Sequence, residues 1–179
     1  MKTRAFTLFE IMVVIMIIAI LAVLMLPVLG KLRARAQRVQ CTANLKSLHV
    51  AVQLYMQENN LWPQIDLNGE SDAPWADFAK QWIAALQPYG PTAKTWICPT
   101  RQHSAANPDY TSPGNERVDY IGTPFDDKPT TPHTVGRTVP WFSEAEDVHG
   151  NGNLVVFADG SVADLKKIAS QLPSSPAPP

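Results

Sequence analysis

The sequence predicts an α+β fold, in which one long N-terminal helix packs on a small, loop-rich domain with a short antiparallel sheet. Three features predict this fold. Residues 11–29 form an uncharged apolar run, residues 31–59 contain neither Gly nor Pro, and Asp159-Gly160 separates two β-prone runs. A chain of 179 residues has room for one ordinary domain and a small extra element.

The charge balance excludes one class of function. The chain has 15 Lys and Arg residues against 16 Asp and Glu residues, which gives a net charge of −1. A protein that binds nucleic acid through its phosphates carries a clear basic excess. We therefore expect no contact with nucleic acid.

The apolar run at residues 11–29 is long enough to cross about 30 Å of hydrocarbon as a helix. The alternative is a secretory signal peptide, with Lys2 and Arg4 in its basic region and a cleavage site at residues 34–36. Two features count against that alternative. The run is longer than the apolar part of an ordinary signal peptide, and the helical pattern continues through the cleavage candidate.

The helical pattern extends well beyond the apolar run. Apolar residues recur at helical spacing in two slightly rotated stripes. They are Leu32, Ala36, Val39 and Ala43, then Leu45, Leu48, Val52 and Tyr55. Asn59, Asn60 and Pro63 end the pattern. The sequence predicts one helix over about residues 7–58, apolar all round in its first half and amphipathic in its second.

After Pro63, turn residues separate several shorter elements. An apolar face predicts a second helix at residues 75–86. Residues 99–146 are loop-rich, with short apolar runs at 120–121 and 139–142 that suit strands. Asp159-Gly160 then predicts a hairpin, because Gly supplies the positive φ angle that a tight turn needs.

Glu10 stands beside the apolar run as a lone carboxylate. Charged side chains at such places are costly and are usually paired. One explanation is local: Thr7 and Glu10 have the spacing of a capping box, in which two side chains satisfy backbone N–H groups of the first helical turn. The residues around Glu10 favour a second explanation.

The N-terminus resembles the type III signal of type IV pilins and type II secretion pseudopilins. A short basic leader, residues 1–5, precedes Phe6, Thr7, Leu8 and Glu10, which match that signal. The resemblance implies that a prepilin peptidase cuts between Ala5 and Phe6 and that the new N-terminus is methylated. Ala5 stands where the family usually has Gly.

The rest of the chain resembles one branch of this family, which carries a His-x9-Asp-Gly motif near the C-terminus. Cys41, Cys98 with the proline after it, and His149 followed after nine residues by Asp159 and Gly160 carry this resemblance. This resemblance implies a pilin-like architecture more directly than it implies a specific biological function.

The family gives Glu10 a role in assembly. Cleavage would leave a positive amine on Phe6, and the Glu10 carboxylate of a neighbouring subunit would neutralise it in the apolar filament core.

The membrane orientation is open to two predictions. Four basic residues follow the apolar run: Lys31, Arg33, Arg35 and Arg38. The positive-inside rule alone would therefore place the C-terminal side in the cytoplasm. The family implies the reverse orientation, with the leader in the cytoplasm. Residues 31–38 would then either pair with acidic surfaces of adjacent subunits or meet solvent and lipid headgroups.

These inferences divide the chain into five parts. They are a leader at 1–5, a transmembrane and filament-core helix at 6–30, the amphipathic half of that helix at 31–60, a globular periplasmic domain at 61–172 and a disordered tail at 173–179.

Cys41 and Cys98 suit a disulfide in an oxidising compartment, where they would join the long helix to the loop after the second helix. Two separate buried thiols are the alternative.

The sequence shows no pattern of metal ligands. The four histidines and Cys98 follow no compact ligand spacing, so we expect no metal site and no cofactor. Acidic loop residues likewise show no calcium-ligand spacing.

His149, Asp159 and Gly160 are expected to form a structural motif that orders the hairpin. The alternative is an acid–base pair of His149 and Asp159 in an anchored hydrolase. No nucleophile motif or phosphate-binding loop occurs in the sequence, so we expect no enzyme.

The sequence therefore predicts a pilin-like or pseudopilin subunit, stored in the inner membrane by a single span and assembled into a type IV pilus-like or type II secretion filament. Its expected partners are the prepilin peptidase, the inner membrane, and other copies or sibling pseudopilins. The alternative is a monomeric membrane-anchored extracytoplasmic module that binds a glycan or a protein.

Overall fold

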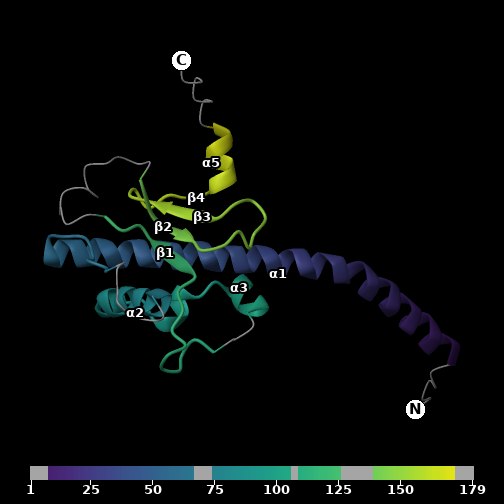
Figure 1. Cartoon of the computed structure of the whole chain (residues 1–179). Coiled ribbons are helices and arrows are strands. Elements are labelled where there is room, and N and C mark those ends of the chain that lie inside the picture. Colours follow the sequence, from purple (N-terminus) through teal and green to yellow (C-terminus); the bar gives the residue numbers. More distant parts are fainter. Residues whose placement is uncertain (1–7, 67–73, 106–108, 126–138, 172–179) are drawn as a thin grey trace, which may run out of the picture. The chain divides into compact units, whose positions relative to one another are not determined.

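A computed structural model describes residues 8–66, 74–105, 109–125 and 139–171, and it has the expected α+β fold (Figure 1). Its helices are α1 (Leu8–Asn59), α2 (Pro74–Leu86), α3 (Pro99–Ser104) and α5 (Leu165–Gln171), with 3₁₀ turns η1 (Gln87–Tyr89) and η2 (Ala93–Trp96). Its strands are β1 (Tyr120–Gly122), β2 (Pro140–Glu144), β3 (Leu154–Phe157) and β4 (Val162–Asp164). The expected long helix, second helix and hairpin are confirmed. The leader at 1–5 and the tail at 173–179 lie outside the described residues.

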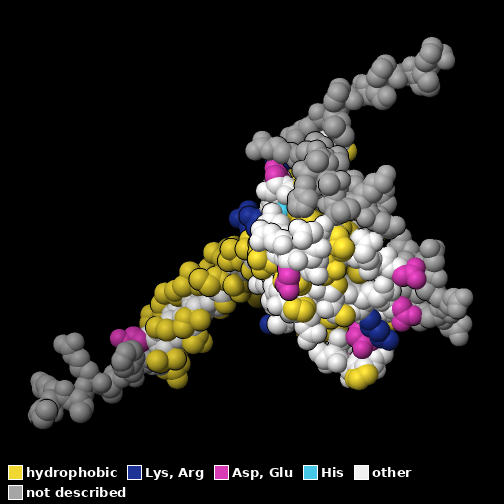
Figure 2. Space-filling view, turned by 90° about the vertical axis from the view of Figure 1, so that its left-hand side faces the viewer, with side chains coloured by type: hydrophobic (Ala, Val, Ile, Leu, Met, Phe, Trp, Pro, Cys, Tyr) yellow, Lys and Arg dark blue, Asp and Glu magenta, His cyan; other side chains and the backbone are white. Residues whose placement is uncertain are grey.

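The chain forms two compact units, residues 1–36 and residues 37–179. In the first unit, every side chain that the structure describes on α1 is exposed. Hydrophobic side chains cover this part of the helix (Figure 2). Among the described residues, α1 is the one helix that is long and apolar enough to cross a membrane.

The second unit contains a four-stranded antiparallel sheet with the order β1-β2-β3-β4. Tyr120 pairs with Glu144 across β1 and β2, and Val155 pairs with Ala163 across β3 and β4. Because each strand pairs with the next strand in the sequence, the sheet is a meander.

The turn between β3 and β4 is a type I turn closed by a left-handed glycine. The Gly160 N–H donates to the Phe157 carbonyl at 2.9 Å, and the Phe157 N–H donates to the Ser161 carbonyl at 2.9 Å. Gly160 has the expected positive φ, at 77°. This is the three-residue hairpin loop that places a glycine at a bulge. In the two strands beside this turn, Val155 is buried, whereas Phe157 and Val162 are half-buried.

The second half of α1 forms one wall of the core. Its buried apolar face starts at Cys41 and continues through Leu45, Leu48, Val52 and Met56 at helical spacing. The earlier of the two predicted stripes lies outside this face, since Leu32 and Val39 are more than half exposed and Ala36 and Ala43 are also exposed. The reason is that the second unit starts at residue 37 and its sheet and loops cover only the later turns.

Aromatic side chains fill the space between α1, α2 and the sheet. Trp62, Trp82, Trp96 and Phe142 are fully buried, and Trp141 nearly so. The Trp62 and Trp141 rings meet edge to face with centroids 5.2 Å apart, and Trp82 meets Phe142 in the same way at 5.1 Å. Such pairs add to the stabilisation that burial alone gives.

Candidate functional site

The first candidate site is the N-terminal part of α1. Glu10 lies in its first turn, among the exposed side chains of Leu8, Phe9 and Ile11. It is the one acidic residue between residues 8 and 36 of the sequence. Ala5 and Phe6, the expected processing residues, lie outside the described residues.

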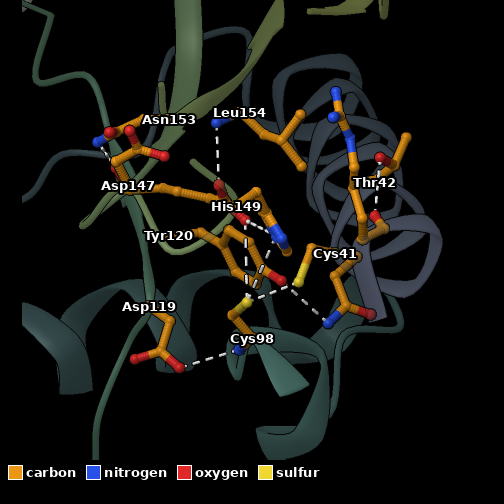
Figure 3. A network of polar contacts seen from close by, with 12 residues as sticks. Cys41, Thr42, Cys98, Asp119, Tyr120, Asp147, His149, Asn153 and Leu154 are labelled. Carbon is orange, nitrogen blue, oxygen red and sulfur yellow. Dashed lines mark hydrogen bonds and ion pairs between the residues drawn. The ribbon is translucent and has the colours of Figure 1, made fainter. Parts of the chain in front are cut away.

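The second candidate site is a buried polar cluster within the globular unit (Figure 3). It contains Cys41 from α1, Cys98 just before α3, Glu144 at the end of β2, and His149 from the loop before β3. One potential ligand atom from each residue lies within 4.8 Å of all the others. Each of the four side chains is at most 5% exposed.

Cys98 lies at the centre of this cluster. Its sulfur is 2.6 Å from the Cys41 sulfur, 3.8 Å from Glu144 Oε1 and 4.0 Å from His149 Nε2. His149 Nε2 lies 3.1 Å from Glu144 Oε1. Both cysteines are free thiols in the structure. The fold thus brings Cys41 and Cys98 together, as the expected disulfide requires, and the disulfide itself stays a prediction.

The protein holds these groups by hydrogen bonds from outside the cluster. The Leu154 N–H donates to Glu144 Oε2 at 2.9 Å, which leaves Oε1 directed at His149. The Cys98 N–H donates to Asp119 Oδ2 at 2.9 Å. The first bond therefore orients the carboxylate of Glu144, and the second holds the backbone of Cys98 in place.

Asp119 is itself a buried junction. Its side chain is 1% exposed and accepts from Arg101 at 2.7 Å and from Arg117 at 2.9 Å. Its backbone N–H donates to the Trp96 carbonyl, and its carbonyl accepts from the Ala145 N–H. In the structure this acidic loop residue forms ion pairs with arginine.

Electrostatic interactions shift the pKa values of the two cysteines in opposite directions. Hydrogen bonding from Cys41 lowers the pKa of Cys98 to about 5, against the effect of burial. The same hydrogen bond, followed by burial, raises the pKa of Cys41. Burial also raises the pKa of Glu144, although the Leu154 N–H and the nearby His149 act in the opposite direction. The hydrogen bond between the two sulfurs thus favours the thiolate form on Cys98 rather than on Cys41.

The remaining part of the expected motif lies at the hairpin turn. His49 of α1 is within 3.1 Å of the Ala158 carbonyl and stacks on Trp141 with centroids 4.7 Å apart. Gly160 lies against the same histidine ring. His149 is therefore placed in the cysteine cluster, whereas Asp159 and Gly160 lie in the turn that packs on His49.

Sequence reasoning did not single out Glu144. Glu144 is buried on the same side of β2 as Phe142, two residues earlier. Because side chains alternate between the two faces of a strand, a buried aromatic residue at position 142 indicates that position 144 is also buried. No sequence pattern indicates that His149 lies next to Cys98, because the two residues are separated by 50 others and match no known spacing of metal ligands.

Comparison with known proteins gives one match. Residues 1–26 match the family model for the prokaryotic N-terminal methylation motif. No curated protein and no solved structure matches the chain. The match supports a precursor of the type IV pilin-like family with a membrane-anchoring N-terminal helix.

Proposed function

We propose that this chain is the precursor of a pilin-like or pseudopilin subunit, cut between Ala5 and Phe6 and assembled into a filament from the inner membrane. The observation that carries this proposal is the N-terminal methylation motif over residues 1–26. Proteins with this motif are substrates of a prepilin peptidase, and they serve as structural subunits rather than as catalysts.

The exposed helix supports a role in assembly. The large hydrophobic side chains that the structure describes between Leu8 and Leu32 are 41–78% exposed. So large an apolar surface is unfavourable in water and needs lipid or other subunits around it. The second unit, residues 37–179, has its own sheet and core, so the exposed helix is free to change its surroundings without unfolding that unit.

Glu10 would set the register between subunits. Cleavage before Phe6 creates a positive amine four residues before Glu10 in the sequence. In an apolar filament core, the carboxylate of one subunit would pair with the amine of its neighbour, since an unpaired charge there costs several kcal/mol.

The family's orientation puts the leader in the cytoplasm and the globular unit in the periplasm. Of the basic residues after the apolar run, Arg38 is already occupied within its own unit, because it binds Asp164 at 2.6 Å. Lys31, Arg33 and Arg35 are exposed. They are the basic residues we assign to anionic lipid headgroups or to acidic surfaces of adjacent subunits.

Replacing Glu10 by leucine is expected to reduce cross-linked oligomers at least tenfold, because the amine of the neighbouring subunit loses its counter-charge. Cells that express the peptidase and the full chain are treated with a cross-linker, and oligomers are quantified by immunoblot. Met16→Leu, on the same exposed part of the helix, is the matched control and should assemble normally.

Membrane insertion and folding of the globular unit should be unchanged in Glu10→Leu. Oligomers that form as readily as in the wild type would mean that Glu10 only caps the helix. A protein that stays monomeric in every variant, including the wild type, would favour the membrane-anchored binding module instead.

A further inference from the structure

We propose that Cys41, Cys98, Glu144 and His149 form a buried, four-coordinate zinc site that joins the long helix to the sheet. The site lies wholly within the globular unit and is independent of N-terminal processing. The proposal concerns how that unit is stabilised.

The donor set suits zinc. Two cysteine sulfurs, one imidazole nitrogen and one carboxylate oxygen are all common zinc ligands, and four protein ligands are typical of a structural rather than a catalytic site. The four donors come from four separate segments of the chain. An ion bound to all of them would therefore cross-link α1, the start of α3, β2 and the loop before β3.

The distances lie close to those that a zinc ion requires. With Zn–S bonds of about 2.3 Å and Zn–N and Zn–O bonds of about 2.1 Å, a tetrahedron separates sulfur from nitrogen or oxygen by about 3.6 Å and nitrogen from oxygen by about 3.4 Å. In the structure, Cys98 Sγ lies 4.0 Å from His149 Nε2 and 3.8 Å from Glu144 Oε1, and the last two atoms are 3.1 Å apart.

The two sulfurs require the largest adjustment. They lie 2.6 Å apart, and a tetrahedral zinc ion would hold them about 3.8 Å apart. Binding of an ion would therefore require the two cysteine side chains to rotate away from each other. The three separations given above, from Cys98 Sγ to Nε2 and Oε1 and between those two atoms, differ from the tetrahedral values by less than about half an ångström.

Groups behind the ligands already hold them in position, as the second shell of a metal site does. Leu154 N–H binds Glu144 Oε2 and leaves Oε1 for the ion. Asn44 donates to the Tyr120 hydroxyl at 3.3 Å, and that hydroxyl lies next to Cys41. The backbone N–H of Cys98 is bound by Asp119.

The cluster's burial also favours an ion. Glu144 is 2% exposed, and removing a carboxylate from water costs several kcal/mol unless a strong partner compensates for it. A disulfide would explain the two cysteines but not why Glu144 and His149 meet at the same sulfur. Zinc binding uses all four groups, and the protons of the ligating thiols go to solvent.

The test measures bound metal in the full chain, purified in detergent with a tag that contains no histidine. Elemental analysis is expected to find about one zinc per chain. Cys41→Ser and His149→Ala should each lose most of this zinc. His103→Ala is the matched control, because His103 is exposed on α3 and should leave the zinc content unchanged.

A second measurement does not depend on variants that fold poorly. Wild-type protein is stripped of zinc with a chelator under reducing conditions and then titrated with Co²⁺. Saturation at about one equivalent, with the sulfur-to-cobalt bands and strong visible bands of a tetrahedral thiolate site, is the expected result.

Two results would overturn the proposal. One is an intact mass lower by about 2 Da with no bound metal, which indicates a Cys41–Cys98 disulfide in place of the site. The other is a chain with two reactive thiols that takes up neither zinc nor Co²⁺. Neither result bears on N-terminal cleavage or on Glu10.

Discussion

Replacing Asp119 by alanine is expected to lower the free energy of unfolding of the globular unit by about 3 kcal/mol. The carboxylate is 1% exposed and binds Arg101, Arg117 and the Cys98 N–H. Its removal leaves the buried Cys98 N–H without this acceptor. It also leaves Arg101 and Arg117 close together without the carboxylate that they share. Urea unfolding of the full chain in detergent, followed by the fluorescence of the buried tryptophans, measures the change.

Asp77→Ala is the matched control for this prediction. Asp77 forms a distant 3.8 Å ion pair with Lys80 at the surface of α2, and such pairs contribute about 1 kcal/mol at most. Equal losses of stability in the two variants would contradict the view that Asp119 is a buried junction of the fold.

Gly160→Val is expected to lower the free energy of unfolding by about 3 kcal/mol, through two separate effects. The φ of 77° is unfavourable for a β-branched residue. In addition, a Cβ at this position would lie 3.1 Å from Cε1 of His49. That ring has little room to move, because it stacks on Trp141 and meets the Ala158 carbonyl.

Gly114→Val separates these two effects. Gly114 also has a positive φ, of 91°, but a Cβ there has no neighbour within 4 Å. The same urea measurement should therefore give a smaller loss for Gly114→Val than for Gly160→Val. A larger loss for Gly114→Val would mean that the hairpin turn does not pack on His49 as the structure indicates.

Periodic patterns in the sequence were sufficient for the larger elements. The absence of Gly and Pro over residues 31–59 and the apolar spacing gave the C-terminal end of α1 to within one residue, and the Asp159-Gly160 signal located the β3–β4 hairpin. These elements depend on local preference and on burial of one face, both of which a single sequence carries.

Short elements and long-range contacts were beyond the same reasoning. The helices α3 and α5 have six and seven residues, too few for a clear periodicity, and the sequence analysis did not predict them. The start of the buried face of α1 depends on where other segments cover the helix, so the apolar spacing alone does not show that Val39 is exposed and Cys41 buried.

The cysteine cluster depends on tertiary contacts in the same way. The sequence favoured pairing of Cys41 with Cys98, and the structure adds Glu144 and His149 from the region between residues 140 and 153. The histidine of the His-x9-Asp-Gly motif thus lies with the cysteines, while its Asp-Gly end lies at the hairpin turn.

The N-terminal mass of the protein extracted from membranes is the most direct test of the proposed function. We expect a chain that starts at Phe6 and carries one methyl group on its amine, because the peptidase signal spans the leader and Phe6 to Glu10. Peptide mapping by mass spectrometry identifies both features. A chain that keeps Met1, or one that starts near Gln37 after cleavage by a signal peptidase, would contradict the proposed pilin-like function.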